Sequence, residues 1–324
     1  MKTTKKDTAK ACAKKAGFAI PDGVDVIVTD ETAVAKLLPK RKRISHKGDY
    51  GKTAIVAGSK RYSGAALLAL SACLRSGVGY TALYTPEWVL DRAVWKAPEG
   101  LLCPIGDGAE LAFDERVFES VLGYSAVAYG MGLGAGEDVG KGLIWLLERY
   151  TGTLLIDADG LNALANMDGE RVEKYMREKK CDVILTPHGK ECSRLTGKPV
   201  EEVVTQPIET AMALAQKWKC VVLLKHAVSI VTDGKNVALN TTGSSGMAKA
   251  GSGDVLSGFC AGLCGFGMKA FAAAICAAWL CGKAGQTAAW EYGEYAVTPS
   301  DTVKFLGEAF LFVAEETDKQ GAKA

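Results

Sequence analysis

The chain has 324 residues, with 39 Lys and Arg against 37 Asp and Glu, and this formal net charge of +2 gives no electrostatic footprint for nucleic acid or an acidic membrane surface. Its 10 cysteines form no Cys-x-x-Cys pair, which argues against zinc sites and disulfide frameworks and favours a reducing, cytoplasmic location. The longest apolar stretch, residues 270–282, ends at Lys283 and is too short to span a bilayer.

The N-terminal region differs in composition from the rest of the chain. Residues 1–25 are rich in lysine and predict an appended arm with a short amphipathic helix. A second short helix is predicted over residues 31–38, where Pro39 ends it. No boundary is visible after Lys47, so we expect residues 26–324 to form one domain.

Beyond Lys47, short β-branched or aliphatic runs alternate with alanine- and leucine-rich runs. Strands are predicted over residues 53–57, 80–84, 126–129, 153–156, 183–185, 221–224 and 229–232. Helices are predicted over residues 64–75, 139–150, 170–179, 208–218, 254–266, 269–289 and 301–316. Apolar strands separated by helices predict an α/β fold, in which a mostly parallel central sheet carries helices on both faces.

Polar and glycine-rich segments follow several of these strands. In open parallel sheets, ligands bind beyond the carboxyl ends of the strands. We therefore expect one rim of the sheet to gather residues 58–59, 130–136, 157–162, 186–188 and 225–226.

The most informative segment is residues 240–258, where glycines at 243, 246, 251 and 253 precede Asp254 and an apolar run of helical spacing. A glycine-rich loop that enters a helix presents free N–H groups and the positive end of the helix dipole, so it can bind an anion. It is not a Walker loop, because Ser252 stands where that motif has Lys. A carboxylate beside a phosphate site predicts that Asp254 is a base, which removes a proton from a hydroxyl during its phosphorylation. The alternative is a glycine turn in which Asp254 is only a helix cap.

A second glycine run follows the strand predicted at residues 126–129. Gly130, Gly132, Gly134 and Ala135 formally fit the dinucleotide fingerprint Gly-x-Gly-x-x-Gly/Ala. No acidic residue closes a second strand about 20 residues later, as that fingerprint requires. We interpret the run as a loop whose backbone approaches a ligand closely.

Three further polar positions follow predicted strands. Asp157 and Asp159 form a carboxylate pair that would bind Mg²⁺ or serve as acid and base, with an Asx-turn and helix cap as the alternative. His188 is a candidate ligand contact at the rim, although an isolated histidine is more often structural. Lys225 would counter a phosphate, and the alternative is a solvated lysine.

Together, and in this order, the motifs resemble the NAD(P)H-hydrate dehydratase family, which has the three-layer ribokinase-like fold. The resemblance covers about residues 29–315 and is more specific than any single motif. It rests on residues 46–52 (His-Lys-Gly-Asp-Tyr-Gly-Lys), 56–59, 62–65, 75–79, 130–134, 157–159, 186–191 and 243–258.

The resemblance implies repair of hydrated NADH and NADPH. A nucleotide phosphorylates the hydroxyl of the (6S)-hydrated nicotinamide ring, phosphate leaves, and the double bond is restored. Asp254 matches the catalytic and substrate-contacting aspartate, and three hydrate-contacting positions match Ala65, Gly134 and His188. The nucleotide-binding positions match Lys225, His226, Ala227, Val228, Ser229, Gly251, Ser252 and Gly253.

The resemblance also sets expectations about cofactors and partners. We expect ADP or ATP as the phosphoryl donor, accompanied by Mg²⁺, and single-domain forms of the family favour ADP. The 50 residues before the core are too few for the family's companion epimerase domain, so a separate epimerase is expected. The family further suggests a homotetramer, for which the small residues around 270–281 offer a packing face, with burial in the core as the alternative.

The chain departs from the family pattern at three places. His226 stands where the family usually has glycine, Ala250 replaces a glycine, and Gly189-Lys190 stands where Pro-Gly usually follows the histidine. None of these changes removes a group that the chemistry needs.

Two other functions stay open. One is a ribokinase-like small-molecule kinase, of thiazole or pyrimidine type, that releases a phosphorylated product. The other is a catalytically idle nucleotide sensor, against which the intact Asp254 argues.

Overall fold

The computed structural model describes residues 5–321, with side chains from 7 to 315. A 10-stranded sheet crosses the molecule in the order β1-β10-β9-β8-β7-β6-β5-β2-β3-β4. In the described sheet β9 runs antiparallel to β8 and β10, and the other neighbours pair in parallel. The strands are β1 Val26–Val28, β2 Lys52–Val56, β3 Tyr80–Thr85, β4 Leu101–Pro104, β5 Ala126–Tyr129, β6 Thr153–Ile156, β7 Asp182–Leu185, β8 Val221–Leu224, β9 Ser229–Thr232 and β10 Val237–Asn240.

Successive residues of the central strands pack into opposite sides of the molecule. In β2, Ile55 belongs to one apolar cluster, whereas Ala54 and Val56 belong to the other. This period of two is the geometry of a β-strand, and both faces are buried here. Burial on both faces explains why these strands read as continuous apolar runs rather than as alternating ones.

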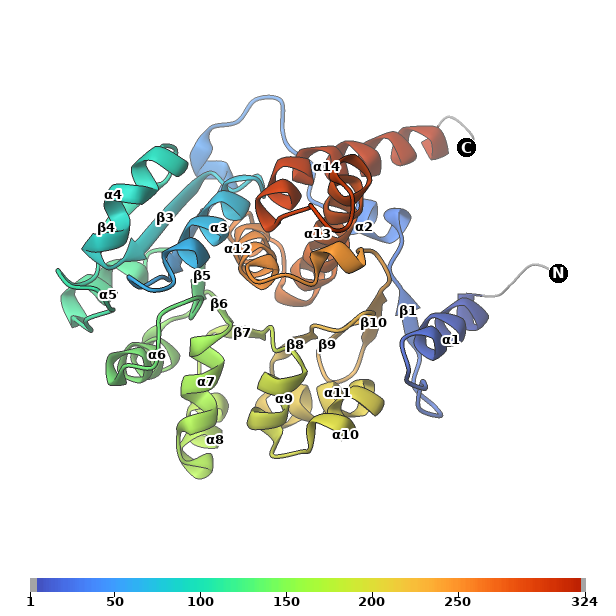
Figure 1. Cartoon of the computed structure of the whole chain (residues 1–324), viewed down its shortest axis with the longest axis horizontal. Helices are drawn as coiled ribbons and strands as arrows, with labels where there is room; N and C mark the ends of the chain where they lie inside the picture. Colours follow the sequence, from blue (N-terminus) through green and yellow to red (C-terminus); the bar gives the residue numbers. More distant parts are fainter. Residues whose placement is uncertain (1–4, 322–324) are drawn as a thin grey trace.

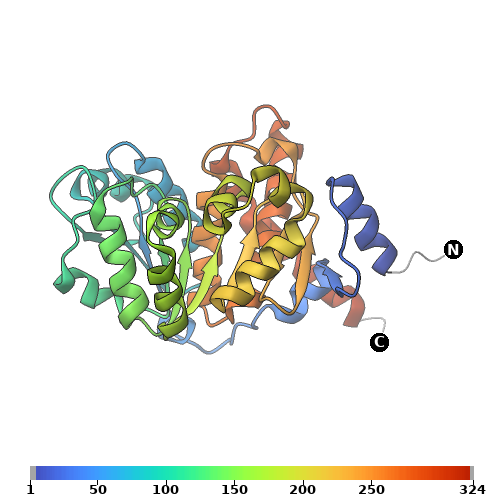
Figure 2. The ribbon, with the colours of Figure 1, turned by 90° about the horizontal axis from the view of Figure 1, so that it is seen from below.

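Helices cover both faces of the sheet, so the molecule has three layers (Figures 1 and 2). One face carries α2 Glu31–Leu37, α3 Ser63–Leu74, α4 Glu87–Lys96, α12 Ser252–Gly265, α13 Ala270–Tyr292 and α14 Pro299–Gly321. The other carries α1 Lys5–Lys15, α5 Glu115–Val121, α6 Glu137–Arg149, α7 Asp159–Asn166, α8 Gly169–Glu178, α9 Gly189–Thr196, α10 Val200–Thr205 and α11 Pro207–Trp218. The predicted α/β class with helices on both faces is confirmed.

Small residues fix the position of α12 against α3. A Cβ atom added at Gly258 would lie 2.1 Å from the carbonyl oxygen of Ala69, and one added at Gly262 would lie 2.2 Å from Oγ of Ser76. Contacts this short leave no room for any other residue type. The register of α12, and with it the place of its N-terminus, is therefore set by close packing of its glycines against the backbone of Ala69 and the side chain of Ser76.

Most predicted elements occur in the structure with ends shifted by a few residues. The structure adds three strands, β1, β4 and β10, and the helices α4, α5, α7, α9 and α10, which the sequence patterns did not predict. β1 and β4 are the two edge strands and are partly exposed, whereas β10, next to an edge, is buried.

The predicted arm contains α1, and two of its side chains join the core of the large domain. Ala13 is 1% exposed and Phe18 is 6% exposed, and both pack in the cluster on the α6 side of the sheet. The chain then enters the sheet as β1, which pairs in parallel with β10. No helix within residues 5–321 combines the length and the apolar character needed to cross a bilayer.

Candidate active site

The expected rim forms where three neighbouring strands end beneath the N-terminus of α12. Asp157 follows β6, His188 follows β7 with Thr186 and Pro187, and Lys225 follows β8. A parallel bridge between His188 and Lys225, with a 2.8 Å hydrogen bond from the Lys225 N–H to the Pro187 carbonyl, continues the sheet by one step. Beside them opens a cavity of about 960 Å³, which reaches from this rim to the glycine-rich loop before α12.

Asp157 is the buried anchor of the site, with 1% of its surface exposed. Its Oδ1 accepts a 2.8 Å hydrogen bond from Nζ of Lys225, and its Oδ2 accepts a 2.7 Å bond from Oγ of Ser257. Ser257 also contacts the hydroxyl of Thr186 at 3.2 Å. A buried carboxylate needs such partners, because burial without them would disfavour its ionised form. The network fixes β6, β7, β8 and α12 to one another.

Lys225 lies between two carboxylates. Its ammonium is 2.8 Å from Asp157 and 3.8 Å from Glu191. Burial lowers the pKa of Lys225, but Asp157 and Glu191 outweigh burial and raise it above its ordinary value. The side chain is therefore a permanent cation at the rim, although about a fifth of it is exposed toward the cavity.

His188 caps α9 and is held by its own helix. Its Nδ1 accepts hydrogen bonds from the N–H groups of Lys190 and Glu191, and Oε2 of Glu191 accepts a 2.8 Å bond from the His188 N–H. Burial and then the nearby Lys225 lower the pKa of His188, and burial raises the pKa of Glu191. Because Nδ1 is occupied as an acceptor, the proton of the neutral ring is on Nε2.

Asp254 lies in the first turn of α12 and lines the cavity. Burial and, after it, the charge of Asp157 raise its pKa to about 7, although Lys225 acts in the opposite direction. A carboxylate whose pKa lies near neutral pH can accept a proton efficiently in a transition state. A carboxylate that served only as a helix cap would gain from staying ionised, so a raised pKa is not expected of such a cap.

Free N–H groups lie next to this carboxylate. Within the described chain, the backbone N–H groups of Gly253 and Asp254 have no protein acceptor, as the first turn of a helix dictates. Gly251 precedes them with φ of 100°, a conformation that glycine adopts without strain. Ser252 fixes the turn by donating a 2.7 Å hydrogen bond to the Met247 carbonyl. The result is a turn with free N–H groups, a candidate anion site with Asp254 at its edge.

Gly253 itself has an ordinary helical φ, so its role is one of space rather than of backbone conformation. A Cβ atom at Gly253 would lie 3.3 Å from Nζ of Lys225 and 3.8 Å from Oδ2 of Asp157. The anion site, the Lys225 ammonium and Asp157 therefore meet at this one glycine.

The second glycine run also closes on the site. The Gly134 N–H donates a 2.8 Å hydrogen bond to Oδ2 of Asp159, and a Cβ atom at Gly130 would lie 2.0 Å from the Asp157 carbonyl oxygen. Between the two aspartates, Ala158 has φ of 48° and ψ of −114°, a strained conformation for a residue with a Cβ atom. The close approach predicted for this loop is toward the aspartate segment of the chain itself.

The cavity gathers most, but not all, of the residues singled out in the sequence. It is lined by Asp254, His188, Lys225, His226, Ala227, Ser229, Gly251, Ser252 and Gly253. Val228 is buried behind it, at 9% exposure. Ala65 and Gly134 are not part of its lining. Ala65 lies against the second glycine run, where a Cβ atom at Gly132 would be 2.9 Å from its own, and Gly134 is held by Asp159 instead.

Two residues of the site were not predicted. Ser257 is one helical turn beyond Asp254, so helical spacing from Asp254 was the available signal. The strain at Ala158 has no counterpart in the sequence, because alanine does not indicate a positive φ.

The side chains offer little for a resident metal ion. No cluster of three His, Cys, Asp or Glu residues with metal-binding geometry occurs among the described residues. Both oxygens of Asp157 and both oxygens of Asp159 already accept hydrogen bonds from protein groups. Mg²⁺ commonly binds through one or two carboxylates plus substrate phosphates. The site therefore fits Mg²⁺ that arrives with a nucleotide, not a preformed metal cage.

Comparison with known proteins identifies the family. A sequence model described as NAD(P)H-hydrate dehydratase matches residues 53–306, the region that contains the whole rim. The chain belongs to the NAD(P)H-hydrate dehydratase family. The match includes all the strands from β2 to β10 and the α12 anion site.

Curated relatives in the family are of two lengths. A bifunctional NAD(P)H-hydrate repair enzyme of Thermofilum pendens is 38% identical over 285 residues, which are 86% of this chain and 53% of that protein. The ADP-dependent (S)-NAD(P)H-hydrate dehydratase of Bacillus subtilis is 34% identical over 235 residues, which are 72% of this chain and 79% of that protein. The chain thus spans about half the length of the bifunctional relatives that it matches.

Solved structures superpose on this chain over most of its length. The ADP/ATP-dependent NAD(P)H-hydrate dehydratase of Bacillus subtilis, co-crystallised with ATP and Mg²⁺, superposes with a TM-score of 0.77 at 30% identity, over 90% of this chain and all of that one. A ribokinase-like protein of Enterococcus faecalis superposes with a TM-score of 0.74 at 23% identity, which shows the shared ribokinase-like fold.

Proposed function

We propose that this protein repairs hydrated nicotinamide nucleotides by nucleotide-dependent dehydration of (6S)-NAD(P)H hydrate to NAD(P)H. The observation that carries the proposal is the position of Asp254, whose pKa is raised to about 7, directly beside the free N–H groups of the α12 turn. A base next to an anion site is the arrangement needed to phosphorylate a hydroxyl.

The first chemical step is phosphoryl transfer. A phosphate of the donor lies on the N–H groups of Gly253 and Asp254, with the Lys225 ammonium at the same glycine to offset its charge. Asp254 accepts the proton of the ring hydroxyl while the hydroxyl oxygen forms its bond to phosphorus and the donor's bridging P–O bond breaks. Buried Asp157 keeps Lys225 in place throughout.

The second step needs little from the protein. The ring nitrogen next to the phosphorylated carbon supplies its electron pair, the C–O bond breaks, and phosphate leaves. The departing phosphate accepts a proton from the neighbouring ring carbon, and the electron pair of that C–H bond restores the double bond. Phosphorylation therefore becomes dehydration without a second catalytic base, and the protein's contribution is positioning and charge stabilisation.

The two sides of the site divide the ligands. We assign the hydrate to Ala65, Gly134, His188 and Asp254. Nε2 of His188 lies 3.4 Å from Oε1 of Glu191, and its N–H can donate to a substrate oxygen in place of this contact. We assign the nucleotide to the cavity side, with Lys225, His226, Ala227, Val228 and Ser229 on one wall and Gly251, Ser252 and Gly253 at its phosphates.

The cofactors and partners follow the same logic. The donor is an adenine nucleotide, ADP in preference to ATP, and Mg²⁺ enters with its phosphates and neutralises part of their charge. We further propose a cytoplasmic homotetramer that depends on a separate epimerase for the other hydrate epimer, with no role for nucleic acid or a membrane. The Bacillus subtilis relatives named as ADP- or ADP/ATP-dependent support the choice of nucleotide.

The test is an assay with purified protein, hydrated NADH or NADPH, and either ADP or ATP. Recovery of absorbance at about 340 nm, where the reduced nicotinamide absorbs, reports the product. We expect absorbance and phosphate to rise together only when both nucleotide and hydrate are present. Accumulation of a stable phosphorylated compound in mass spectrometry, without NADH, would instead assign the protein to the small-molecule kinases.

A further inference from the structure

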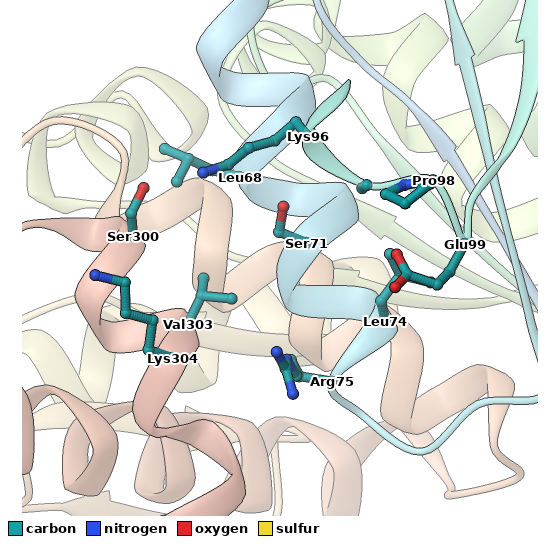
Figure 3. A pocket seen from close by; sticks show the side chains of 11 residues that line it. Leu68, Ser71, Leu74, Arg75, Lys96, Pro98, Glu99, Ser300, Val303 and Lys304 are labelled. Carbon is teal, nitrogen blue, oxygen red and sulfur yellow. The ribbon is translucent and has the colours of Figure 1, made fainter. Parts of the chain in front are cut away.

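A second cavity lies on the face of the sheet that carries α3, α4 and α14, and no step of the proposed reaction uses it (Figure 3). Its volume is about 420 Å³. Leu68, Ser71 and Arg75 of the α3 segment form one wall, Lys96 at the end of α4 forms another, and Ser300 with Lys304 at the start of α14 forms the third. The successive helices α3 and α4 therefore meet α14, which is distant from them in the sequence, to build one pocket.

The lining of this pocket is basic. Arg75, Lys96 and Lys304 line the pocket, together with one carboxylate, Glu99. Lys304 already forms a 2.8 Å ion pair with Asp301. Within the part of the chain that the structure describes, Arg75 and Lys96 have no ion-pair partner, and both side chains are exposed to solvent. Two uncompensated cations on the wall of a cavity fit a ligand with a doubly charged phosphate.

The basic pocket adjoins the candidate active site. Leu68 lines it, and a Cβ atom at Gly251 of the anion loop would lie 2.6 Å from Cδ1 of the same leucine and 3.2 Å from Cγ of Pro299. At the start of α14, Thr302 lines the large cavity, whereas its neighbour Val303 lines the basic pocket. A layer of side chains that includes Leu68 and Pro299 therefore lies between the two spaces.

Helix α3 connects the hydrate position to the cations. Arg75 is ten residues beyond Ala65, which places them about 15 Å apart along the helix axis at 1.5 Å per residue. In a nicotinamide dinucleotide, the pyrophosphate is one ribose away from the nicotinamide ring. The phosphate on the adenosine ribose is farther, beyond both riboses and the pyrophosphate. A distance of about 15 Å fits this more distant phosphate better than the pyrophosphate.

We propose that the basic pocket binds the phosphate on the adenosine ribose of NADPH hydrate, and that Arg75 and Lys96 make this protein prefer NADPH hydrate to NADH hydrate. The inference rests on the proposed function, and it adds the substrate preference and the residues that set it. A contact that binds the substrate and the transition state equally lowers KM without changing kcat, and we expect this behaviour of a phosphate contact far from the reacting ring.

The experiment compares both hydrates at saturating ADP with the wild type and with the double variant Arg75→Gln and Lys96→Gln. We expect KM for NADPH hydrate to rise about tenfold in the variant, with kcat kept, and KM for NADH hydrate to change less than about twofold. Glu99→Gln removes the opposing charge and should lower KM for NADPH hydrate. The matched control, Lys174→Gln with Arg177→Gln, removes the same charges from α8 on the other face of the sheet and should change neither KM.

The outcomes separate the two proposals. If the wild type converts neither hydrate, the proposed function fails and the inference fails with it. If both hydrates are converted and the double variant changes KM for both equally, or for neither, the pocket does not bind the phosphate on the adenosine ribose. If inorganic phosphate alone changes both rates in the wild type but not in the double variant, the pocket belongs to a free phosphate ligand, and the inference is overturned.

Discussion

At the residue scale, Asp254 has the burial, charge environment and neighbours of a general base, and it should be the least replaceable side chain. Asn at this position keeps the size and much of the capping ability but cannot accept the proton. Loss of a positioned base typically lowers the rate by about 10²–10⁴. We expect Asp254→Asn to reduce kcat by that factor, as measured by the absorbance of the reduced nicotinamide at about 340 nm. Calorimetry should show that ADP binding is retained.

Thermal unfolding of the same variant provides a control for misfolding. The pKa of Asp254 is raised to about 7 in the folded protein, above its ordinary value of 3.8. The stability that this carboxyl contributes is therefore present below pH 4 and is lost as the pH rises through 7. At pH 8, Asp254→Asn should unfold at a higher temperature than the wild type. A variant that turned over within about threefold of the wild-type rate would remove Asp254 from the base role.

The pH profile tests the same carboxyl in the unmodified protein. Burial, and then the charge of Asp157, hold its pKa near 7, so about half of the molecules carry the active ionised form at neutral pH. We expect kcat/KM to rise about tenfold per pH unit below 7 and to level off above it. A group with this pKa titrates roughly between pH 5 and 8. A value of kcat/KM that stayed constant over this range would contradict a base with this pKa.

At the element scale, the first turn of α12 is proposed to hold the transferred phosphate by its backbone. A Cβ atom at Gly253 would already lie 3.3 Å from the Lys225 ammonium, so the branched side chain of Gly253→Val occupies the space of the phosphate. We expect ADP affinity to fall by about tenfold or more, because charge-assisted contacts to phosphate are lost. Calorimetric titration with ADP measures this directly.

The control for this variant is Gly307→Val, because Gly307 lies in a helix with open space around the position of its Cβ atom. Circular dichroism should show both variants folded. Unchanged ADP affinity in Gly253→Val would remove the α12 turn as the phosphate site.

The arm acts on the same cavity through an aromatic contact. Phe18 packs edge-on against the ring of His226, with 5.6 Å between centroids and 80° between planes, and His226 lines the nucleotide side of the cavity. Such pairs are worth about 0.5–1.5 kcal/mol beyond their buried area. Phe18→Ala should therefore weaken ADP binding by about two- to tenfold, with KM for the hydrate less affected.

Phe18→Leu is the matched control, because it keeps an apolar group in the core and removes only the ring edge. An effect on ADP binding in both variants indicates that the ring contact positions His226. Equal ADP affinity in the wild type and both variants would limit the arm to a role in stability.

The sequence predicted the central elements of the fold and the rim of the site, but not the edges or the strain. Strands such as β5 and β8 are buried on both faces, so their apolar runs are unmistakable. β4 lies at an edge with exposed residues, and Pro104 in its short run argues against a strand anywhere but at an edge. Ser257 and the positive φ of Ala158 depend on how distant strands and helices pack, which no local pattern records.

At the scale of the whole molecule, the helix that suggested an oligomer face proves to be part of the core. The small residues of α13, including Ala273, Ala277 and Cys276, are fully buried within the single chain. They are therefore not available to a second copy, and the buried-core alternative for this helix is confirmed.

The homotetramer remains a prediction. The surface feature that supports it is a set of large aromatic side chains exposed to solvent. Trp290 is 91% exposed and Tyr295 is 101% exposed beside the end of α13, and Trp95 is 89% exposed on α4. Exposed aromatic side chains of this size commonly mark an interface.

Light scattering at micromolar concentration should give about four times the chain mass of 34.2 kDa. Trp290→Ser with Tyr295→Ser should lower that mass, whereas Trp95→Ser tests the α4 surface separately. A wild-type particle of one chain mass would show that the protein acts as a monomer, with these aromatics exposed to solvent.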